Sequence, residues 1–293
     1  MTTRVAYLGP NGSFAGAAAR ALTAGRDVEL VPAVSVQAAL DAARDGSVDQ
    51  ALVPIENSVE GSVSVTLDEL AAGRRLVIID KPDAVQTEIR IGALAIPRKH
   101  PDYLAWDLAV KILGGEGANR LHQVLRSARG LTYGAEADTD ARKDAGAYVA
   151  QTDTRTETTA EALKLAVDEF TRLQREKVGL RELGDAQAYL AGSFPLTIET
   201  PNAIATQILN NVFYELPLEE VGTFRERVLA ITPEEIQRVS RAYIRPDRLS
   251  IVLVGNARQF LQKLAAFGFT NIEVIGVDQV DLLSPTLKKD TRR

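Results

Sequence analysis

The sequence contains no cysteine. This absence excludes disulfide bonds, cysteine-based zinc sites and thiol nucleophiles. Histidine is almost as scarce, because His100 and His122 are the only two in 293 residues. A catalytic zinc needs three protein ligands held in a fixed geometry. The shortage therefore restricts metal binding and acid–base catalysis sharply, and we expect no metal ligands and no cofactor in this chain.

The sequence also lacks an excess of positive charge, since its formal net charge is -5. It offers no basic field to attract nucleic acid or an anionic membrane, so we expect neither as a partner. No hydrophobic run approaches the length of a membrane span. The N-terminus has no apolar core of the kind found in signal peptides, and we expect a cytoplasmic protein.

The remaining composition is that of an ordinary globular protein, and its length predicts roughly two domains. The first part alternates strands and helices, with short strands expected at 5–8, 28–31 and 49–55 and a third helix at about 63–71. Strands separated by single helices pair in parallel. The sequence therefore predicts an α/β unit with a three-stranded parallel sheet.

Two loops of this unit, Gly9–Ser13 and Glu56–Ser62, follow strands and run into predicted helices. Ligands of open α/β sheets bind at the carboxyl ends of the strands. Free amide groups at a helix N-terminus favour an anion. A small carboxylate or phosphate ligand is one interpretation of these loops, and two ordinary turns are the other.

The same stretches resemble prephenate dehydratases. The matching segments are Val5-Ala-Tyr-Leu-Gly-Pro-Asn-Gly-Ser-Phe14, Ala51-Leu-Val-Pro-Ile-Glu-Asn-Ser-Val-Glu-Gly-Ser-Val63 and Thr66-Leu-Asp-Glu-Leu70. The resemblance implies a lobe like those of periplasmic binding proteins and a reaction that converts prephenate to phenylpyruvate in phenylalanine biosynthesis. It also implies that Asn57, Ser58 and Gly61 bind the substrate in a cleft between two lobes.

This resemblance ends near residue 75, and the Thr-Arg-aromatic motif of the family's second lobe does not follow in a matching context. Half a cleft cannot position a substrate around its transition state. We therefore expect residues 1–75 to form a truncated lobe. We expect a second domain at 76–285 and a tail at 286–293, with the seam between 71 and 83.

The second part predicts an α+β order. Asp102 is expected to cap a helix. Strands are expected at 85–96, 132–137, 145–152, 249–254 and 272–275, and helices at 103–113, 159–176, 181–191, 202–214, 218–230, 233–243 and 260–267. The segment 76–79 fits either the end of the first unit or the beginning of the second.

The stretch from Asn119 to Tyr133 predicts a helix followed by the beginning of a strand. Apolar residues recur at helical spacing up to Ala128, and Gly130 is a natural helix stop. Arg126 should then lie in the last helical turn and Tyr133 at the beginning of the next strand. Their guanidinium and phenol groups could both donate hydrogen bonds to one oxygen. An ordinary helix-end cation beside an interfacial tyrosine is the plainer interpretation.

The second part resembles the C-terminal half of an insulinase-type metallopeptidase, of the pitrilysin and mitochondrial-processing-peptidase kind. The matching segments are Gln86–Gly92, Ile112–Gly115, Asn119–Leu121, Leu125–Tyr133, Tyr189–Leu196 and Val252–Gly255. The resemblance implies that two such halves enclose a peptide-cleaving chamber. One half carries the zinc motif His-x-x-Glu-His, and the other supplies an Arg and a Tyr. Those positions correspond to Arg126 and Tyr133 here.

Neither histidine begins a His-x-x-Glu-His motif. We therefore expect the chain alone to be inactive as a peptidase, and zinc to come only from a partner subunit. The implied function is to bind peptide and stabilise an oxyanion for a zinc-bearing partner or after self-association. The alternative is a prephenate dehydratase, and a third interpretation is a folded fusion with neither activity.

Overall fold

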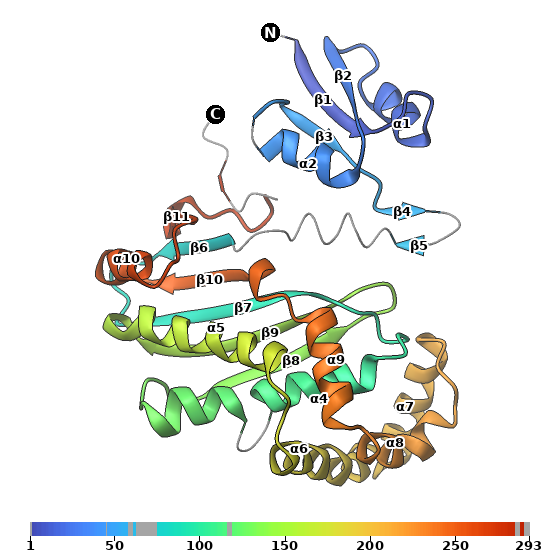
Figure 1. The fold of residues 1–293 in the computed structure, drawn as a ribbon, viewed down its shortest axis with the longest axis vertical. Helices are drawn as coiled ribbons and strands as arrows, with labels where there is room; N and C mark the ends of the chain where they lie inside the picture. Colours follow the sequence, from blue (N-terminus) through green and yellow to red (C-terminus); the bar gives the residue numbers. More distant parts are fainter. Residues whose placement is uncertain are drawn as a thin grey trace. The chain divides into compact units, whose positions relative to one another are not determined.

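A computed structural model describes residues 2–44, 46–57, 61–62, 75–115, 119–284 and 288–289 of the chain. Contacts between residues divide the chain into two compact units, Met1–Ala72 and Gly73–Arg293. The division lies close to the boundary that the sequence predicts at 75–76. Each unit has its own sheet (Figure 1) and is described separately.

The first unit is built on a three-stranded parallel sheet with the strand order β2-β1-β3. Its elements are β1 (Thr3–Leu8), α1 (Phe14–Leu22), β2 (Val28–Ala33), α2 (Val36–Arg44) and β3 (Gln50–Leu52). A small core of Ala6, Ala39 and Val48 joins the sheet to α2. Ser13 caps α1 by accepting a hydrogen bond of 3.1 Å from the amide of Gly16. The predicted parallel α/β unit is confirmed.

The third strand is shorter than the predicted range 49–55, because β3 ends at Leu52. Pro54 follows soon after, and proline cannot donate a hydrogen bond to a sheet ladder. The chain then forms a small antiparallel pair, β4 (Glu56–Asn57) and β5 (Gly61–Ser62), in which Asn57 is opposite Gly61. Ser58 and the helix predicted at 63–71 lie outside the described residues.

The second unit is built on a six-stranded mixed sheet with the order β11-β6-β10-β7-β9-β8. Its strands are β6 (Arg75–Asp80), β7 (Gln86–Ala95), β8 (Ala135–Ala141), β9 (Gly146–Arg155), β10 (Ser250–Gly255) and β11 (Ile272–Gly276). Strand β6 pairs in parallel with both β10 and β11. Residues 76–79 therefore begin the second unit instead of ending the first.

Helices cover one face of this sheet. Several further helices follow one another in the sequence after the strand β9. In chain order, the helices of this unit are α4 (Tyr103–Gly114), the π-helix η1 (His122–Ala128), α5 (Thr159–Arg175), α6 (Leu180–Ser193), α7 (Pro201–Phe213), α8 (Glu220–Leu229), α9 (Pro233–Tyr243) and α10 (Ala257–Ala266). Short 3₁₀ turns occur at Thr156–Thr158, Phe194–Ile198, Pro246–Arg248 and Val277–Gln279. In Figure 1, α4 and α5 lie beside β8 and β9. The predicted α+β half-domain is confirmed.

The core of the second unit lies between the sheet and these helices. Alternate strand residues such as Ile89, Ile91 and Ile251 are at most 1% exposed and face it. Trp106 of α4 is fully buried against Tyr148 of β9, with the two rings 5.0 Å apart and edge to face. The strand residues that alternate with these buried ones point to the opposite face of β7, β8 and β9. That face is open to solvent.

Two local predictions are wrong. Asp102 precedes α4 but makes no capping bond. Its carboxylate instead accepts hydrogen bonds of 2.9 and 2.6 Å from Arg238 and one of 2.7 Å from the Tyr243 hydroxyl. The strand expected at 132–137 begins at Ala135 and continues to Ala141, so Tyr133 precedes the strand.

Candidate functional site: a fixed corner beside a sheet-edge groove

The candidate site begins with the helix that carries Arg126. Asn119 holds its N-terminus, because the side chain accepts a hydrogen bond of 2.8 Å from the amide of His122 and donates another to the carbonyl of Gly115. Arg120 fixes the same turn to α6 through a two-point ion pair with Glu182, at 2.6 and 3.0 Å. The Arg120 side chain is only 5% exposed. Two buried anchors therefore position the beginning of this helix.

The helix is wider than an ordinary α-helix, because His122–Ala128 forms a π-helix. Single-turn π-segments are rare in proteins, but those that do occur often lie at functional sites. It ends at Ala128, and Gly130 follows two residues later with a φ of 61°, in the left-handed region that glycine adopts without strain. The amides of Gly130 and Leu131 donate nested hydrogen bonds to the carbonyls of Arg126 and Leu125, at 2.9 and 2.8 Å. The predicted stop at Gly130 is confirmed.

The turn that carries Tyr133 is fixed by hydroxyl groups. The Thr132 hydroxyl donates a hydrogen bond of 2.7 Å to the Gly134 carbonyl and accepts one of 3.1 Å from the Gly134 amide. Thr152 of β9 lies 2.9 Å from the same carbonyl, and Thr154 donates to the Leu131 carbonyl at 2.7 Å. The backbone on both sides of Tyr133 is therefore held against β9.

Arg126 and Tyr133 lie on this one helix-to-strand connection, which we call the corner. Both side chains are exposed. Tyr133 is 80% exposed. The Arg126 guanidinium lies 3.4 Å from Nε2 of His122, one helical turn earlier. No hydrogen bond joins Arg126 to Tyr133 in the described part of the chain. The structure thus presents a cation and a phenol to solvent from a rigid backbone.

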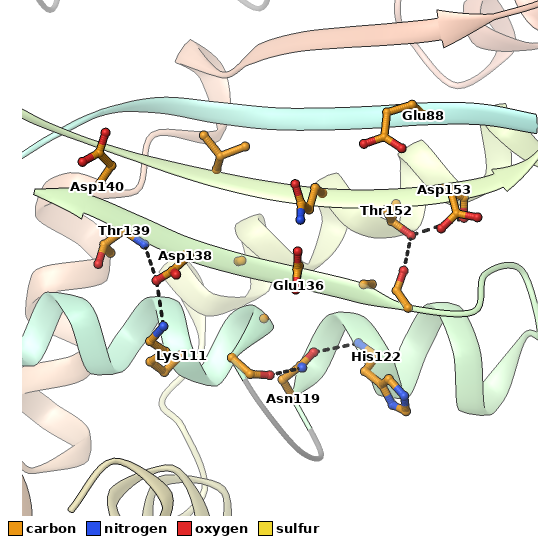
Figure 2. Close-up of a pocket in the computed structure, with 17 residues that line it drawn as sticks. Glu88, Lys111, Asn119, His122, Glu136, Asp138, Thr139, Asp140, Thr152 and Asp153 are labelled. Atoms are coloured by element: carbon orange, nitrogen blue, oxygen red, sulfur yellow. Dashed lines mark hydrogen bonds and ion pairs between the residues drawn. The ribbon is translucent and has the colours of Figure 1, made fainter. Parts of the chain in front are cut away.

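A groove of about 890 Å³ adjoins this corner (Figure 2). It runs along strand β8 and over the open face of the sheet, with the end of α4 and His122 along its other side. Its lining residues are Glu88, Lys111, Gly114, Gly115, Asn119, His122, Gly134, Ala135, Glu136, Ala137, Asp138, Thr139, Asp140, Val149, Gln151, Thr152 and Asp153. Gly134, the neighbour of Tyr133, lines the groove and links it to the corner.

Five carboxylates line the groove, against one lysine. We call Glu88, Glu136, Asp138, Asp140 and Asp153 the carboxylate face. Lys111 donates a hydrogen bond of 2.7 Å to Asp138. Burial of Lys111 opposes its charge, but this bond and the nearby Asp107 carboxylate outweigh burial and raise its pKa. Lys111 therefore stays charged at neutral pH and neutralises one carboxylate of the five.

Close packing brings α4 to the groove. A Cβ atom at Gly114 would collide with the backbone nitrogen of Ala137, so only glycine allows the helix to approach β8 this closely. Asp107 of the same helix is half-buried and accepts a hydrogen bond of 2.6 Å from Thr139. Burial raises the pKa of the Asp107 carboxyl. The floor of the groove is thus a packed helix and strand.

Among the described residues, no three or more His, Cys, Asp or Glu side chains form a group that could hold a metal ion. His100 lies away from the groove, where its Nδ1 accepts a hydrogen bond of 3.1 Å from the amide of Asp102. Nor does that part of the chain contain a helix long and apolar enough to cross a membrane.

Residues singled out from the sequence divide into two groups. Arg126 and Tyr133 reach one exposed corner, whereas Asn57 and Gly61 are opposite each other in a small strand pair of the first unit. The sequence reasoning missed the carboxylate face and the threonine anchors. A signal was available, because Thr152 and Thr154 occupy alternate positions of β9, and Glu136, Asp138 and Asp140 occupy alternate positions of β8.

Comparisons with known proteins show what each part of the chain is similar to. The family profile described as "Peptidase M16 inactive domain" matches residues 55–190, and the profile described as "Prephenate dehydratase" matches residues 5–97. The second unit has the M16 inactive-domain fold, and the N-terminal region is prephenate-dehydratase-like. Both predicted resemblances are confirmed.

Solved structures agree with this assignment of the second unit. The crystal structure of a peptidase M16 inactive domain from Pseudomonas fluorescens is 32% identical, with a TM-score of 0.58, and the match covers 62% of this chain and 44% of that one. A protease from Helicobacter pylori is 19% identical, with a TM-score of 0.57, over 63% of this chain and 45% of that one. The second likeness shows the fold alone.

The N-terminal region matches curated prephenate dehydratases. That of Amycolatopsis methanolica is 44% identical over 108 residues, which is 35% of each chain. That of Mycobacterium avium is 52% identical over 83 residues, which is 26% of each chain. This chain thus spans about a quarter to a third of the length of these relatives.

Proposed function

We propose that the second unit is the Arg/Tyr half of a two-part zinc metallopeptidase. It binds peptide and stabilises the oxyanion while a partner subunit supplies the zinc. The observation that carries the proposal is the pair of exposed side chains, Arg126 and Tyr133, on a backbone fixed at both ends beside a groove. The M16 inactive-domain fold supports it.

The chemistry follows from the donors at this corner. Arg126 contributes a permanent positive charge and Tyr133 a hydroxyl, so both can donate to the scissile carbonyl oxygen. The partner's zinc would supply the activated water, and Arg126 and Tyr133 would donate to the carbonyl oxygen as negative charge develops on it. Donors held in place beforehand stabilise this charge without reorganising. The threonine anchors at Thr132 and Thr152 supply that rigidity for Tyr133.

Complementation tests the proposal. The purified chain is mixed with each of a panel of M16 subunits that carry His-x-x-Glu-His, and cleavage of a fluorogenic peptide is followed. We expect cleavage by at least one mixture and none by this chain alone. Size-exclusion chromatography of the same mixtures should show a complex. Cleavage by the chain alone, or a lack of cleavage by every mixture, would contradict the proposal.

A prephenate dehydratase is the second candidate function, and the match of residues 5–97 favours it. The described part of the first unit has the β1 and β3 strand ends at which such a sheet binds ligands, and a small carboxylate would suit the capped N-terminus of α1. Incubation of the chain with prephenate, followed by phenylpyruvate absorbance, tests this candidate. We expect no turnover, because a single lobe does not enclose a substrate.

A further inference from the structure

Helix α7 exposes its apolar side to solvent. Its five large apolar residues are 43 to 66% exposed, namely Ile204, Ile208, Leu209, Val212 and Phe213. We call these five residues the α7 face. On the other side of the helix, Gln207 is half-buried and Asn211 is only 4% exposed. A surface helix normally buries its apolar side and exposes its polar side, and α7 does the reverse.

Polar contacts hold α7 in this orientation. The side-chain amide of Asn211 donates a hydrogen bond of 3.1 Å to the carbonyl of Pro217. In the turn between them, Glu215 forms ion pairs of 2.8 and 2.9 Å with Lys99 and Lys143. Glu215 has a φ of 58°, a left-handed conformation that a residue other than glycine keeps only when its surroundings hold it there. A rotation of α7 that buried its apolar side would break these contacts.

The α7 face lies apart from the candidate site. The main neighbours of α7 are the 3₁₀ turn Phe194–Ile198 and α8, beside which it lies in Figure 1. Leu196 of that turn and Leu218 of the connection to α8 are exposed as well. No residue of α7 lines the groove beside the corner. An exposed group of apolar side chains marks an interaction surface, whereas single exposed ones do not.

The absence of charge indicates which partner covers this surface. Among the α-helices that the structure describes, α7 alone contains no Asp, Glu, Lys or Arg. A two-fold symmetric dimer places a patch against the same patch of a second copy. A charged patch would then repel itself, and the whole chain has a net charge of -5. A different protein could instead offer opposite charges, so neutrality is a condition of self-association alone.

The spacing of the residues fits such a dimer. Two neighbouring rows run along the helix, Ile204-Ile208-Val212 and Ala205-Leu209-Phe213. Rows of residues four apart form ridges, and the ridges of one helix fit the grooves of another at a crossing angle of about −50°. We infer that α7 of one molecule packs against α7 of a second copy of this chain. This inference goes beyond the proposed peptidase function and does not depend on it.

The size of the surface predicts a weak dimer. The 13 residues of α7 span about 20 Å, and the surface is one helix wide. It is therefore smaller than the roughly 800 Å² per partner of a standard stable interface. We expect a dimer that is half-dissociated at about 10 to 100 μM. Sedimentation equilibrium of the full chain from about 1 to 300 μM measures this dissociation.

Variants of Leu209, in the middle of the α7 face, test the contact. Leu209→Glu should weaken the dimer by about 10-fold or more, because two carboxylates then meet near the two-fold axis. Leu209→Lys should weaken it equally, whereas an equimolar mixture of the two variants should dimerise because opposite charges meet. Leu180→Glu is the matched control, since Leu180 is an 81% exposed leucine at the beginning of α6. It should leave the dissociation constant unchanged.

Cross-linking provides a second measurement, because the chain has no cysteine of its own. Leu209→Cys introduces a single thiol at the contact, and mild oxidation should join two copies. Leu180→Cys should stay monomeric under the same oxidation. Circular dichroism and thermal unfolding of every variant should match those of the original chain, since both leucines are exposed.

Concentration-dependent dimerisation that each charged variant loses and their mixture regains is the result that supports the inference. A monomer at every concentration, a dimer unaffected by Leu209→Glu, or a mixture that stays monomeric would overturn it. It would also be wrong if the chain were monomeric and Leu209→Glu instead prevented binding to a zinc-bearing M16 subunit. That last result would leave the proposed function standing, because cleavage by the complex is measured separately.

Discussion

The hydroxyl of Thr152 on β9 lies 2.9 Å from the carbonyl oxygen of Gly134, the residue that follows Tyr133. Thr152 is only 7% exposed, whereas Tyr133 is 80% exposed. A buried side chain of one strand thus holds the backbone beside an exposed tyrosine of the preceding connection. Because Thr132 also bonds to Gly134, the turn has two hydroxyl anchors.

Replacing Thr152 by valine keeps the shape of the side chain and removes its hydroxyl. A lost buried hydrogen bond of this kind costs about 1 kcal/mol. We expect Thr152→Val to lower the free energy of unfolding by about that amount and to speed hydrogen exchange of the Gly134 amide about fivefold. Thr152→Ser keeps the hydroxyl and should restore slow exchange at Gly134. Equal exchange rates in the two variants would show that the hydroxyl does not hold the turn.

Gly114 allows α4 to contact the backbone of β8, so a methyl group there has no room. We expect Gly114→Ala to destabilise the protein by about 1 to 3 kcal/mol or more, since overpacking forces the helix away from the strand. Gly222→Ala is the control, because Gly222 lies inside α8 with nothing within 4 Å of an added Cβ. It should instead stabilise the protein by about 0.5 to 1 kcal/mol. Urea unfolding measures both changes, and a neutral Gly114→Ala would refute the close contact.

Asp102 makes the stability of the folded protein depend on pH. The hydrogen bond from Arg238 is the main cause that lowers its pKa, from 3.8 to about 2, and the Tyr243 hydroxyl adds to this effect. A carboxyl with a lowered pKa stabilises the folded state fully above its unfolded pKa, and this contribution is lost as the pH falls from about 4 to about 2. Because Arg238 is 55% exposed, we expect about 1 to 2 kcal/mol at neutral pH.

Asp102→Asn should therefore lower the free energy of unfolding by about 1 to 2 kcal/mol at pH 7, and the difference from the original chain should shrink towards pH 2. Denaturant titrations at several pH values measure it. Asp185→Asn changes a 70% exposed carboxylate of α6 and serves as a control, with an expected effect within about 0.5 kcal/mol. A difference that does not depend on pH would contradict the assigned partnership.

Local sequence signals predict much of this fold, because they depend on neighbours along the chain. Helix α9 begins at Pro233 as predicted, and Thr232 and Glu235 form the reciprocal capping bonds that such a start favours. Asp102 shows the limit of these signals. It has the residue type of a helix cap, but its partner Arg238 is 136 positions away and no local pattern could reveal it.

The corner that carries the candidate site also combines features that local sequence signals predict with features that depend on distant residues. Helical spacing and Gly130 predict where the helix ends, and both are local properties. The strand was expected to begin at Thr132, because Leu, Thr and Tyr favour extended chain. In the structure the Thr132 hydroxyl instead forms a turn with Gly134, held by Thr152 from another strand. The π-helix and the groove also depend on packing between distant segments, so they could not be predicted from the sequence.

The rate of peptide cleavage by the complex with a zinc-bearing M16 subunit tests the proposed function most directly. We expect Arg126→Ala and Tyr133→Phe each to lower kcat/KM on the order of 100-fold, the usual loss for one oxyanion donor, with complex formation unchanged. Arg225→Ala and Tyr189→Phe change an arginine of α8 and a tyrosine of α6 and should keep full activity. Full activity of the Arg126 and Tyr133 variants would contradict the proposed function.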